Sequence, residues 1–253
     1  MSGVNYRRAD PAGNITLLIE DRFPVSEYPK AASALLALDR TAEQAGFIEE
    51  LSESSVTLHM AGGEFCGNAS LSAAALALMR HGKDRGTVSV NVYGIPEPLS
   101  ASLEKTSDSV YSGSLTMPLP KSCTRVTLPF DGETHVLPLV TFPGIGHLIS
   151  RKIGDDAKAE SAVKKWCGML GLPALGIIQL DQENQTLRPL VYVSAVDTLF
   201  WEHSCASGTC AAVYWLSREL GPGTWHFKEP GGILGASAGD GVLTLLGSVS
   251  FQQ

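Results

Sequence analysis

The chain is poor in charged residues. Asp, Glu, Lys and Arg make up only 18% of its 253 residues, against about 25% in an average globular protein. Its 26 acidic residues outnumber the 19 basic ones, which gives a formal net charge of −7, and no long basic run is present. A nucleic-acid partner is therefore not expected, because nucleic-acid binding requires a basic patch or stripe.

Long apolar runs are also missing. The longest, around residues 71–79, is far shorter than the roughly 20 residues that a membrane span needs. The opening MSGVNYRRADPAGN has no apolar core of the signal-peptide type. Apolar residues nevertheless make up 44% of the chain, which is enough for a folded core. These features predict a soluble, cytoplasmic protein of one or two domains that does not bind membranes.

Cysteines are few and odd in number, and without a secretory signal they do not suggest a disulfide framework. They are Cys66, Cys123, Cys167, Cys205 and Cys210. A cytosolic cysteine is most often a small buried hydrophobe. We assign that role to Cys123, Cys167 and Cys210, and a different role to the other two for the reasons below.

Hydrophobic periodicity predicts an α/β protein of two similar halves. The expected strands are Ile15–Glu20, Val56–Met60, Thr87–Tyr93, Ser109–Met117, Val136–Phe142, Gly176–Leu180 and Leu190–Ser194; the expected helices are Ala31–Leu51, Asn68–His81, Ala157–Leu170 and Thr209–Leu220; and Gly241–Phe251 is expected to form a closing strand pair or hairpin. The MPLP segment at 117–120 marks a break. We therefore expect domains at 1–121 and 122–253, with the last strand a candidate to pack on the first half.

Residue motifs repeat between the two halves. Gly13-Asn14 precedes a strand in the first half, as Gly146-His147 does in the second. Further on, CGNASLSAA at 66–74 corresponds to CASGTCAAV at 205–213, at a similar distance from the earlier motif. Chance similarity of short Ala, Gly and Ser strings is the alternative. The repetition predicts two pseudo-symmetric halves with a cleft between them.

In both motifs a cysteine precedes the small residues that open a helix. A thiol at this point lies in the positive end of the helix dipole, which is expected to lower its pKa. Unpaired backbone N–H groups at the same helix end suit a carboxylate. Gly67, Ala206 and Gly208 would let a ligand approach the backbone, and Asn68 or Ser207 would serve as cap or first-turn residues.

Two such helix ends facing each other would form a two-base racemase site. Cys66 and Cys205 would then lie on opposite faces of the α-carbon, one removing the α-proton and the other returning a proton. Backbone N–H groups would stabilise the enediolate that forms in between. This chemistry requires no metal and no cofactor.

The paired motifs resemble those of diaminopimelate epimerase and its cofactor-independent amino-acid racemase relatives. The resemblance runs through the whole chain, and it includes Gly13-Asn14, EFCGN at 64–68, Met117-Pro118, GIGH at 144–147, CASGTC at 205–210 and PGGIL at 230–234. It implies that each half is a β-barrel-like sheet around a central helix, with the active site in the cleft between the halves. It also implies that Cys66 and Cys205 are the catalytic pair.

Departures from the epimerase pattern argue against diaminopimelate as the substrate. The family's Glu-Arg-Gly segment is replaced here by YVSAVD at 192–197, which has no arginine for a distal carboxylate. The opening PAGN at 11–14 and AEQAGFI at 42–48 instead resemble the histidine racemases of opine-metallophore (staphylopine-type) synthesis. That resemblance makes Glu43 a site candidate, with Glu202 as the acidic residue from the other half. Either one would receive the α-ammonium or an imidazole group.

The sequence thus predicts an amino-acid racemase, independent of pyridoxal phosphate, that converts L-histidine to D-histidine for metallophore synthesis and forms a homodimer. Its expected substrate-binding residues are Asn14, Glu43, Gly67, Asn68, Glu202, Ala206, Ser207 and Gly208. Alternatives are a diaminopimelate epimerase-like or broad-specificity racemase, a phenazine-type isomerase, and a redox-sensing amino-acid-binding module. The cysteine pair counts against the phenazine-type isomerases, which lack it.

Overall fold

The computed structural model describes residues 3–151, 154–194 and 197–252. The chain divides into two compact units, one of Met1–Met117 with Thr244–Gln253 and one of Pro118–Leu243. The first change from one unit to the other falls between Met117 and Pro118, inside the MPLP segment. The second falls within the last strand, so the C-terminal residues belong to the first unit.

The first unit is a closed β-barrel. Its strands are β1 (Tyr6–Asp10), β2 (Thr16–Ile19), β3 (Gln44–Leu51), β4 (Ser55–Met60), β5 (Arg85–Val92), β6 (Leu99–Ser107), β7 (Val110–Thr116) and β16 (Val242–Gln252). They pair in the order β1 to β7 and then β16. Strand β16 also pairs with β1, through partners such as Ala9 and Phe251, and this pairing closes the barrel.

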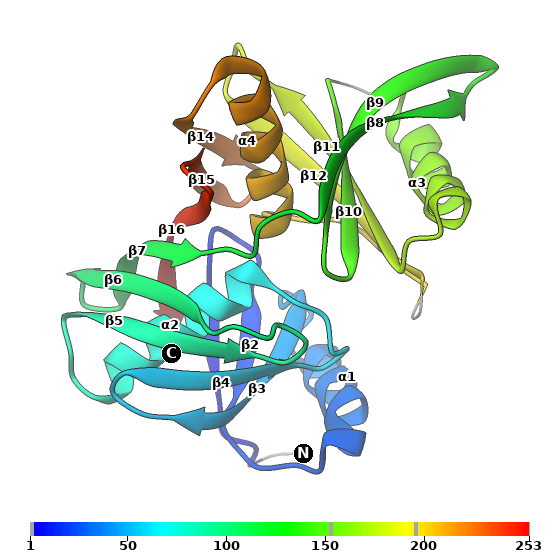
Figure 1. Ribbon diagram of the computed structural model, residues 1–253. Coiled ribbons are helices and arrows are strands. Elements are labelled where there is room, and N and C mark those ends of the chain that lie inside the picture. Colours follow the sequence, from blue (N-terminus) through cyan, green and yellow to red (C-terminus); the bar gives the residue numbers. More distant parts are fainter. Residues whose placement is uncertain (1–2, 152–153, 195–196, 253) are drawn as a thin grey trace. The chain divides into compact units, whose positions relative to one another are not determined.

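Helix α2 (Gly67–Arg80) runs through this barrel (Figure 1) and packs on strands β2 to β7. Every residue from Gly67 to Leu78 is buried, which explains why the helix is rich in Ala and Leu on all sides. Helix α1 (Tyr28–Leu38), preceded by the short 3-10 helix η1 (Val25–Glu27), packs outside the barrel on β3. Its buried Ala31, Ala32 and Leu35 share a core cluster with Phe47.

The second unit is a sheet with a helix on each face (Figure 1). Its strands are β8 (Ser122–Phe130), β9 (Glu133–Phe142), β10 (Ile145–Ser150), β11 (Ala174–Asp181), β12 (Thr186–Val193), β13 (Thr198–Trp201), β14 (Gly223–Glu229) and β15 (Gly232–Gly239). They follow the order β8-β9-β10-β11-β12-β14-β15, with β13 also paired to β12. Helix α4 (Ala206–Leu220) packs on β9, β10, β11, β14 and β15, whereas α3 (Asp156–Leu170) packs on β11 and β12 around the buried Trp166.

The two units repeat one order of elements, as the duplicated motifs predict. The first contains β2-α1-β3-β4-α2-β5-β6 and the second β10-α3-β11-β12-α4-β14-β15. In each series the first strand pairs with the second in parallel, the second with the third antiparallel, the third with the fourth in parallel, and the fourth with the fifth antiparallel. The two-half α/β fold is therefore confirmed, and each half carries a helix of small residues that begins directly after a cysteine.

The predicted helix over Ala31–Leu51 is wrong. The helix ends at Leu38, and residues 44–51 form β3, which pairs with both β2 and β4. Asp39 closes a turn after the helix, since its carboxylate accepts the Thr41 N–H at 3.1 Å. Both faces of the first half of β3 are buried, so its apolar residues do not alternate and resemble a helical pattern.

The other predicted helices and strands lie closer to those in the structure. The remaining three helices are confirmed, each beginning one to three residues earlier than expected. The C-terminal Gly241–Phe251 segment is not a hairpin by itself: it is the single strand β16, which follows β15 through a turn at Asp240 and Gly241, both with positive φ. Sequence periodicity did not find β1, β6, β8, β10, β13, β14 or β15. Cys123, expected in the core, is only half-buried on β8.

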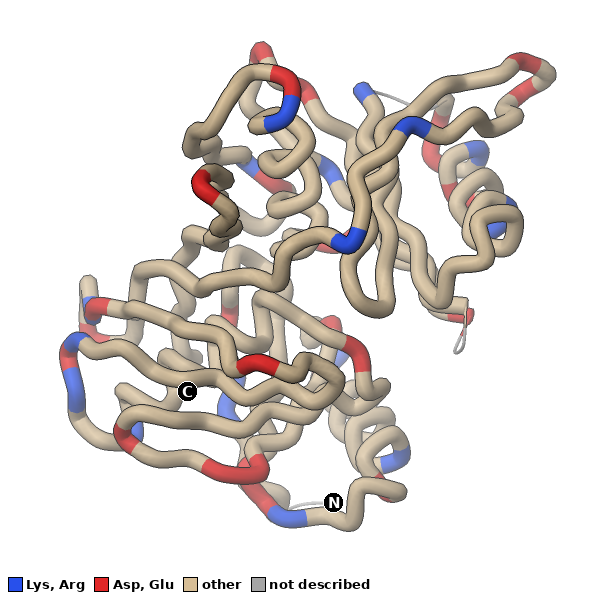
Figure 2. Tube along the Cα trace, viewed as in Figure 1, with Lys and Arg blue, Asp and Glu red and all other residues tan. Residues whose placement is uncertain are grey.

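Charged side chains of both signs are interspersed within each unit (Figure 2). Among the residues that the structure describes, no helix combines the length and apolar character needed to cross a bilayer.

Candidate active site

Cys66 is the N-cap of α2. Its backbone is extended (φ −132°, ψ 115°), and its sulfur accepts a hydrogen bond from the Ala69 N–H at 3.5 Å. Its carbonyl accepts from both the backbone N–H and the hydroxyl of Ser70, at 3.0 and 2.7 Å. The half-buried sulfur thus takes the role that a Ser or Asp oxygen plays at an ordinary helix start. Gly67 and Asn68, expected at the site, form the buried first turn behind it.

Cys205 is the N-cap of α4, with a similar extended backbone (φ −136°, ψ 103°). Unlike the sulfur of Cys66, its sulfur accepts no capping hydrogen bond from the helix. It lies 3.6 Å from Oγ of Ser207, which in turn lies 2.9 Å from Nε2 of His147 on β10. The residue is 6% exposed, so its thiol is largely removed from water.

Burial and neighbouring carboxyl groups raise the pKa of Cys205 well above that of an ordinary thiol. Burial is the largest cause, and Glu202 and Glu229 add to it, whereas the hydrogen bond with Ser207 acts in the opposite direction. The expectation that the helix dipole lowers this pKa is therefore wrong for Cys205. A dipole at a helix end contributes only about 0.3–1 kcal/mol, which does not offset desolvation and two acidic neighbours.

Glu229, at the end of β14, is a site residue that sequence reasoning missed. Its carboxylate is 2% exposed and accepts two hydrogen bonds from α4, one from the Cys205 N–H at 2.9 Å and one from the Thr209 hydroxyl at 2.5 Å. Burial raises the pKa of Glu229 to about 8. The only signal in the sequence was an acidic residue ahead of Pro-Gly-Gly, and nothing there linked it to a cysteine 24 residues earlier.

His147, which the sequence aligned with Asn14, is fully buried. Burial lowers its pKa to about 3, so the ring is neutral at physiological pH. Its Nε2 contacts Ser207, and its Nδ1 is buried with no hydrogen-bond partner, close to Gly176. A Cβ added at Gly176 would lie 2.3 Å from that Nδ1 atom, so the glycine makes room for the ring.

Asn14 and Glu43, two candidates from different parts of the sequence, are in direct contact. Nδ2 of Asn14 donates to Oε2 of Glu43 at 2.6 Å. Gln44, which was not a candidate, donates from Nε2 to Oδ1 of Asn14 at 2.5 Å and to the Thr16 hydroxyl at 2.8 Å. Glu43 lies between α1 and β3 rather than on a helix face, and its N–H bonds the carbonyl of Ile15.

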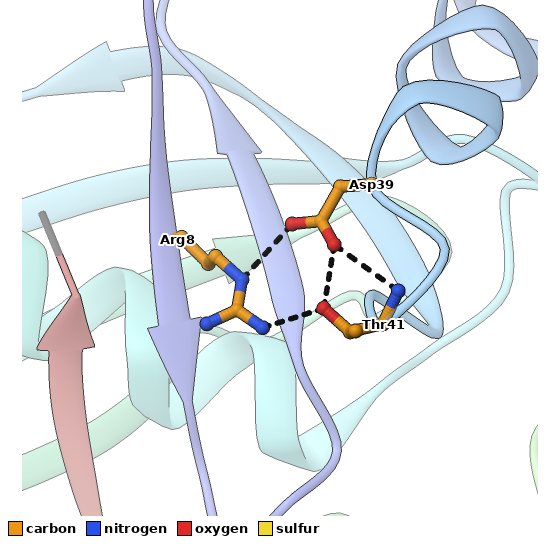
Figure 3. Close-up of polar contacts among 3 residues, drawn as sticks. All are labelled: Arg8, Asp39 and Thr41. Carbon is orange, nitrogen blue, oxygen red and sulfur yellow. Dashed lines mark hydrogen bonds and ion pairs between the residues drawn. The ribbon is translucent and has the colours of Figure 1, made fainter.

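The turn that leads to Glu43 is fixed by Arg8 on β1. Its Nε bonds the Asp39 carboxylate at 2.9 Å and its guanidinium also donates to the Thr41 hydroxyl at 2.6 Å (Figure 3). Thr41 itself bonds Asp39 through both its hydroxyl and its backbone N–H. The three residues hold the segment between α1 and β3, which ends at Glu43.

The predicted site residues therefore fall into three local groups. In the first unit, Asn14 joins Glu43, and Gly67 and Asn68 follow Cys66. In the second unit, Glu202, Ala206, Ser207 and Gly208 surround Cys205. Gly208 is held tightly, since a Cβ there would lie 2.5 Å from Cδ1 of Ile178 and 3.3 Å from the Cys205 sulfur. Within the described ranges, no three His, Cys, Asp or Glu side chains form a cluster suited to a metal ion.

Solved structures with a similar fold include epimerases. A hydroxyproline epimerase from Agrobacterium vitis, with bound trans-4-hydroxy-L-proline, matches 98% of this chain and 90% of its own with a TM-score of 0.67 at 11% identity. A PhzF-family phenazine biosynthesis protein from Enterococcus faecalis matches 98% and 96% with a TM-score of 0.62 at 14% identity. At such low identities the likeness concerns the fold, which is that of the diaminopimelate epimerase and PhzF proteins.

Sequence relatives specify the class of enzyme. Curated relatives named histidine racemase include one from Fusobacterium nucleatum subsp. nucleatum (strain ATCC 23726 / VPI 4351), 33% identical over 91% of this chain and 88% of its own. Another, from Staphylococcus aureus (strain Mu50 / ATCC 700699), is 25% identical over 90% of this chain and 86% of its own. With the epimerase fold, they identify the protein as an isomerase of the racemase and epimerase type. The family described as "Histidine racemase CntK N-terminal domain" matches residues 3–240. The chain belongs to this histidine racemase family.

Proposed function

We propose that this chain racemises histidine at its α-carbon, with Cys66 and Cys205 as the two bases. The observation that carries the proposal is the N-cap position of each cysteine, at the start of α2 in one unit and of α4 in the other. Relatives named histidine racemase, at 33% and 25% identity, support histidine as the substrate.

The reaction requires the two sulfurs to meet opposite faces of the α-carbon. One thiolate takes the α-proton, and the opposite thiol donates its proton to the other face. In between, the negative charge moves into the substrate carboxylate as an enediolate. Backbone N–H groups in the first turns of α2 and α4 stabilise this charge, and the reaction needs no pyridoxal phosphate.

Backbone N–H groups in the first turns of both helices would bind the substrate carboxylate. They belong to Gly67 and Asn68 on α2 and to Ala206, Ser207 and Gly208 on α4. The small side chains at these positions allow a close approach to the backbone. Two carboxylates would receive the α-ammonium and the imidazole group. One is Glu43, which accepts a hydrogen bond from Asn14, and the other is Glu202, which raises the pKa of the Cys205 thiol.

Hydrogen–deuterium exchange at Cα tests the proposal directly. Purified protein is incubated in D₂O with L-histidine, D-histidine, diaminopimelate, 4-hydroxyproline and a panel of common amino acids. We expect α-deuteration and loss of optical activity with both histidine enantiomers. Faster exchange with another amino acid would make histidine the wrong substrate, and no exchange with any of them would overturn the racemase proposal.

We further assign the D-histidine to opine-metallophore synthesis and the enzyme, as a homodimer, to the cytoplasm. The resemblance of the PAGN opening to the staphylopine-type racemases supports the first assignment. Catalysis by two free thiols suits a reducing compartment. Disrupting the gene should remove the D-histidine moiety from a metal-binding product detected by mass spectrometry, and light scattering should give twice the mass of one chain.

A further inference from the structure

Glu229 occupies an uncommon position for a carboxyl group, because it lies buried at the start of helix α4, whose N-cap residue Cys205 is a proposed base. Both of its oxygens are used: Oε2 accepts the Cys205 N–H at 2.9 Å, and Oε1 accepts the Thr209 hydroxyl at 2.5 Å. With 2% of the residue exposed, water does little to screen its charge. The proposed reaction gives this group no role.

The hydrogen bonds around the two N-cap cysteines, at the starts of α2 and α4, differ. At α2 the sulfur of Cys66 accepts the Ala69 N–H, an arrangement that favours a thiolate. At α4 the group that accepts a backbone N–H is the Glu229 carboxyl, and the Cys205 sulfur accepts no capping bond. The pKa of Glu229, raised to about 8 by burial, still lies below the pKa of Cys205, so as the pH rises Glu229 becomes negative first, and its charge then disfavours a second one on the neighbouring sulfur.

We propose that Glu229 is a positioning residue that keeps Cys205 in its thiol form in the resting enzyme, so that Cys205 is the proton donor and Cys66 the thiolate. The inference rests on the proposed function, since the two roles have meaning only in a two-base reaction. One turnover moves the α-proton to Cys66 and the Cys205 proton to the substrate. Loss of the Cys66 proton to water and uptake of one by Cys205 then restore the resting form.

The groups around Cys205 agree with this assignment. Among the described residues, Glu202, Glu229 on β14 and, through Ser207, His147 on β10 face it, and Cys210 on α4 interacts with Glu229. Both carboxyl groups raise the pKa of Cys205, and burial with Glu229 also raises that of Cys210. The ring of His147 is neutral and adds no positive charge that would favour a thiolate.

Alkylation by iodoacetamide between pH 5 and 10, quantified for each cysteine peptide by mass spectrometry, tests the proposal. In the unmodified chain we expect the midpoint of Cys205 alkylation at a higher pH than that of Cys66. Glu229→Gln can still accept the Cys205 N–H and bond Thr209, but it removes the charge. We expect it to lower the Cys205 midpoint by about one pH unit, with the Cys66 and Cys123 midpoints unchanged.

Two further variants keep the test decisive. Glu219→Gln removes an exposed carboxylate from the far end of α4 and should leave the Cys205 midpoint unchanged. If Glu229→Gln does not fold, Thr209→Val serves in its place. In that variant the Glu229 carboxylate loses a hydrogen-bond donor and stays protonated up to a higher pH, so the midpoint of Cys205 alkylation should fall by a smaller amount. An unchanged midpoint in the folded variants overturns the proposal. A shifted midpoint in a protein that exchanges no Cα proton would instead refute only the proposed function.

Discussion

Nδ2 of Asn14 donates a 2.6 Å hydrogen bond to Oε2 of Glu43, although helix α1 separates the two residues along the chain. The orientation of the amide follows from Gln44, whose N–H₂ group donates to the Asn14 oxygen and so directs the Asn14 nitrogen toward the carboxylate. This bond fixes the orientation of the Glu43 carboxylate, which in the proposed reaction binds a cationic group of the substrate.

Glu43→Gln should weaken histidine binding more than turnover. Removing one charged hydrogen-bond partner typically costs about 1.5–3 kcal/mol, which corresponds to a rise in KM of roughly 10- to 100-fold. Steady-state kinetics by chiral chromatography would measure KM and kcat separately. Glu53→Gln, an exposed carboxylate paired with Lys83, is the control and should change neither. An unchanged KM in Glu43→Gln would remove this residue from the binding site.

Cys66→Ser and Cys205→Ser should each abolish racemisation, because a serine hydroxyl is a far weaker acid and base than a thiol. We expect the rate to fall at least ~10²–10⁴-fold, the usual contribution of one proton-transfer group. Cys123→Ser, at a half-buried position on β8, should keep full activity. If either of the first two variants retained more than a tenth of the rate, the two-base mechanism would be wrong.

Arg8→Ala should loosen the turn that leads to Glu43. The side chains of Arg8 and Asp39 are each 21% exposed, so the loss of stability should be small, about 1 kcal/mol or a fall in Tm of about 2–4 °C. A rise in KM for histidine should accompany it if the turn positions Glu43. Arg125→Ala, which removes an exposed ion pair with Glu219, should leave KM unchanged. A normal KM in Arg8→Ala would show that β3 alone positions Glu43.

Gly208→Ala should disrupt the start of α4, since the added Cβ would lie 2.5 Å from Ile178 and 3.3 Å from the Cys205 sulfur. We expect overpacking to cost about 1–3 kcal/mol in the free energy of unfolding, with most activity lost. Gly168→Ala is the matched control: it lies in helix α3, its Cβ meets nothing within 4 Å, and it should stabilise the protein by about 0.5–1 kcal/mol. Urea unfolding would measure both, and a neutral Gly208→Ala would contradict the tight packing.

Stability should fall in acid because of His147. Burial lowers its pKa from the usual 6.5 to about 3, so between these values the unfolded chain binds a proton that the folded chain does not. The stability from the neutral ring is complete above pH 6.5 and is lost as the pH falls toward 3, by up to ~1.4 kcal/mol per pH unit. His147→Gln should flatten this slope in urea titrations between pH 4 and 7. His135→Gln, on β9, is the control, and an equal effect of both would refute the assignment to His147.

The two cysteine positions could be predicted because the signal is local. A cysteine followed by mostly small residues starts a helix at both Cys66 and Cys205. The helix after Cys66 is buried inside its barrel, and the helix after Cys205 packs on its sheet. The β3 segment could not be predicted in this way. It is buried on both sides by strands and a helix from elsewhere in the chain, so its apolar residues carry no period that separates strand from helix.

Composition and local pattern alone therefore determined that this is an α/β protein of two repeated halves, each with a cysteine at the start of a helix. Tertiary structure decided the electrostatics. It joined Asn14 to Glu43 across helix α1, and it brought Glu229 from β14 to the backbone of Cys205. The sign of the Cys205 pKa shift followed from burial first, then from Glu202 and Glu229, because desolvation and charge depend on which groups surround a thiol in space.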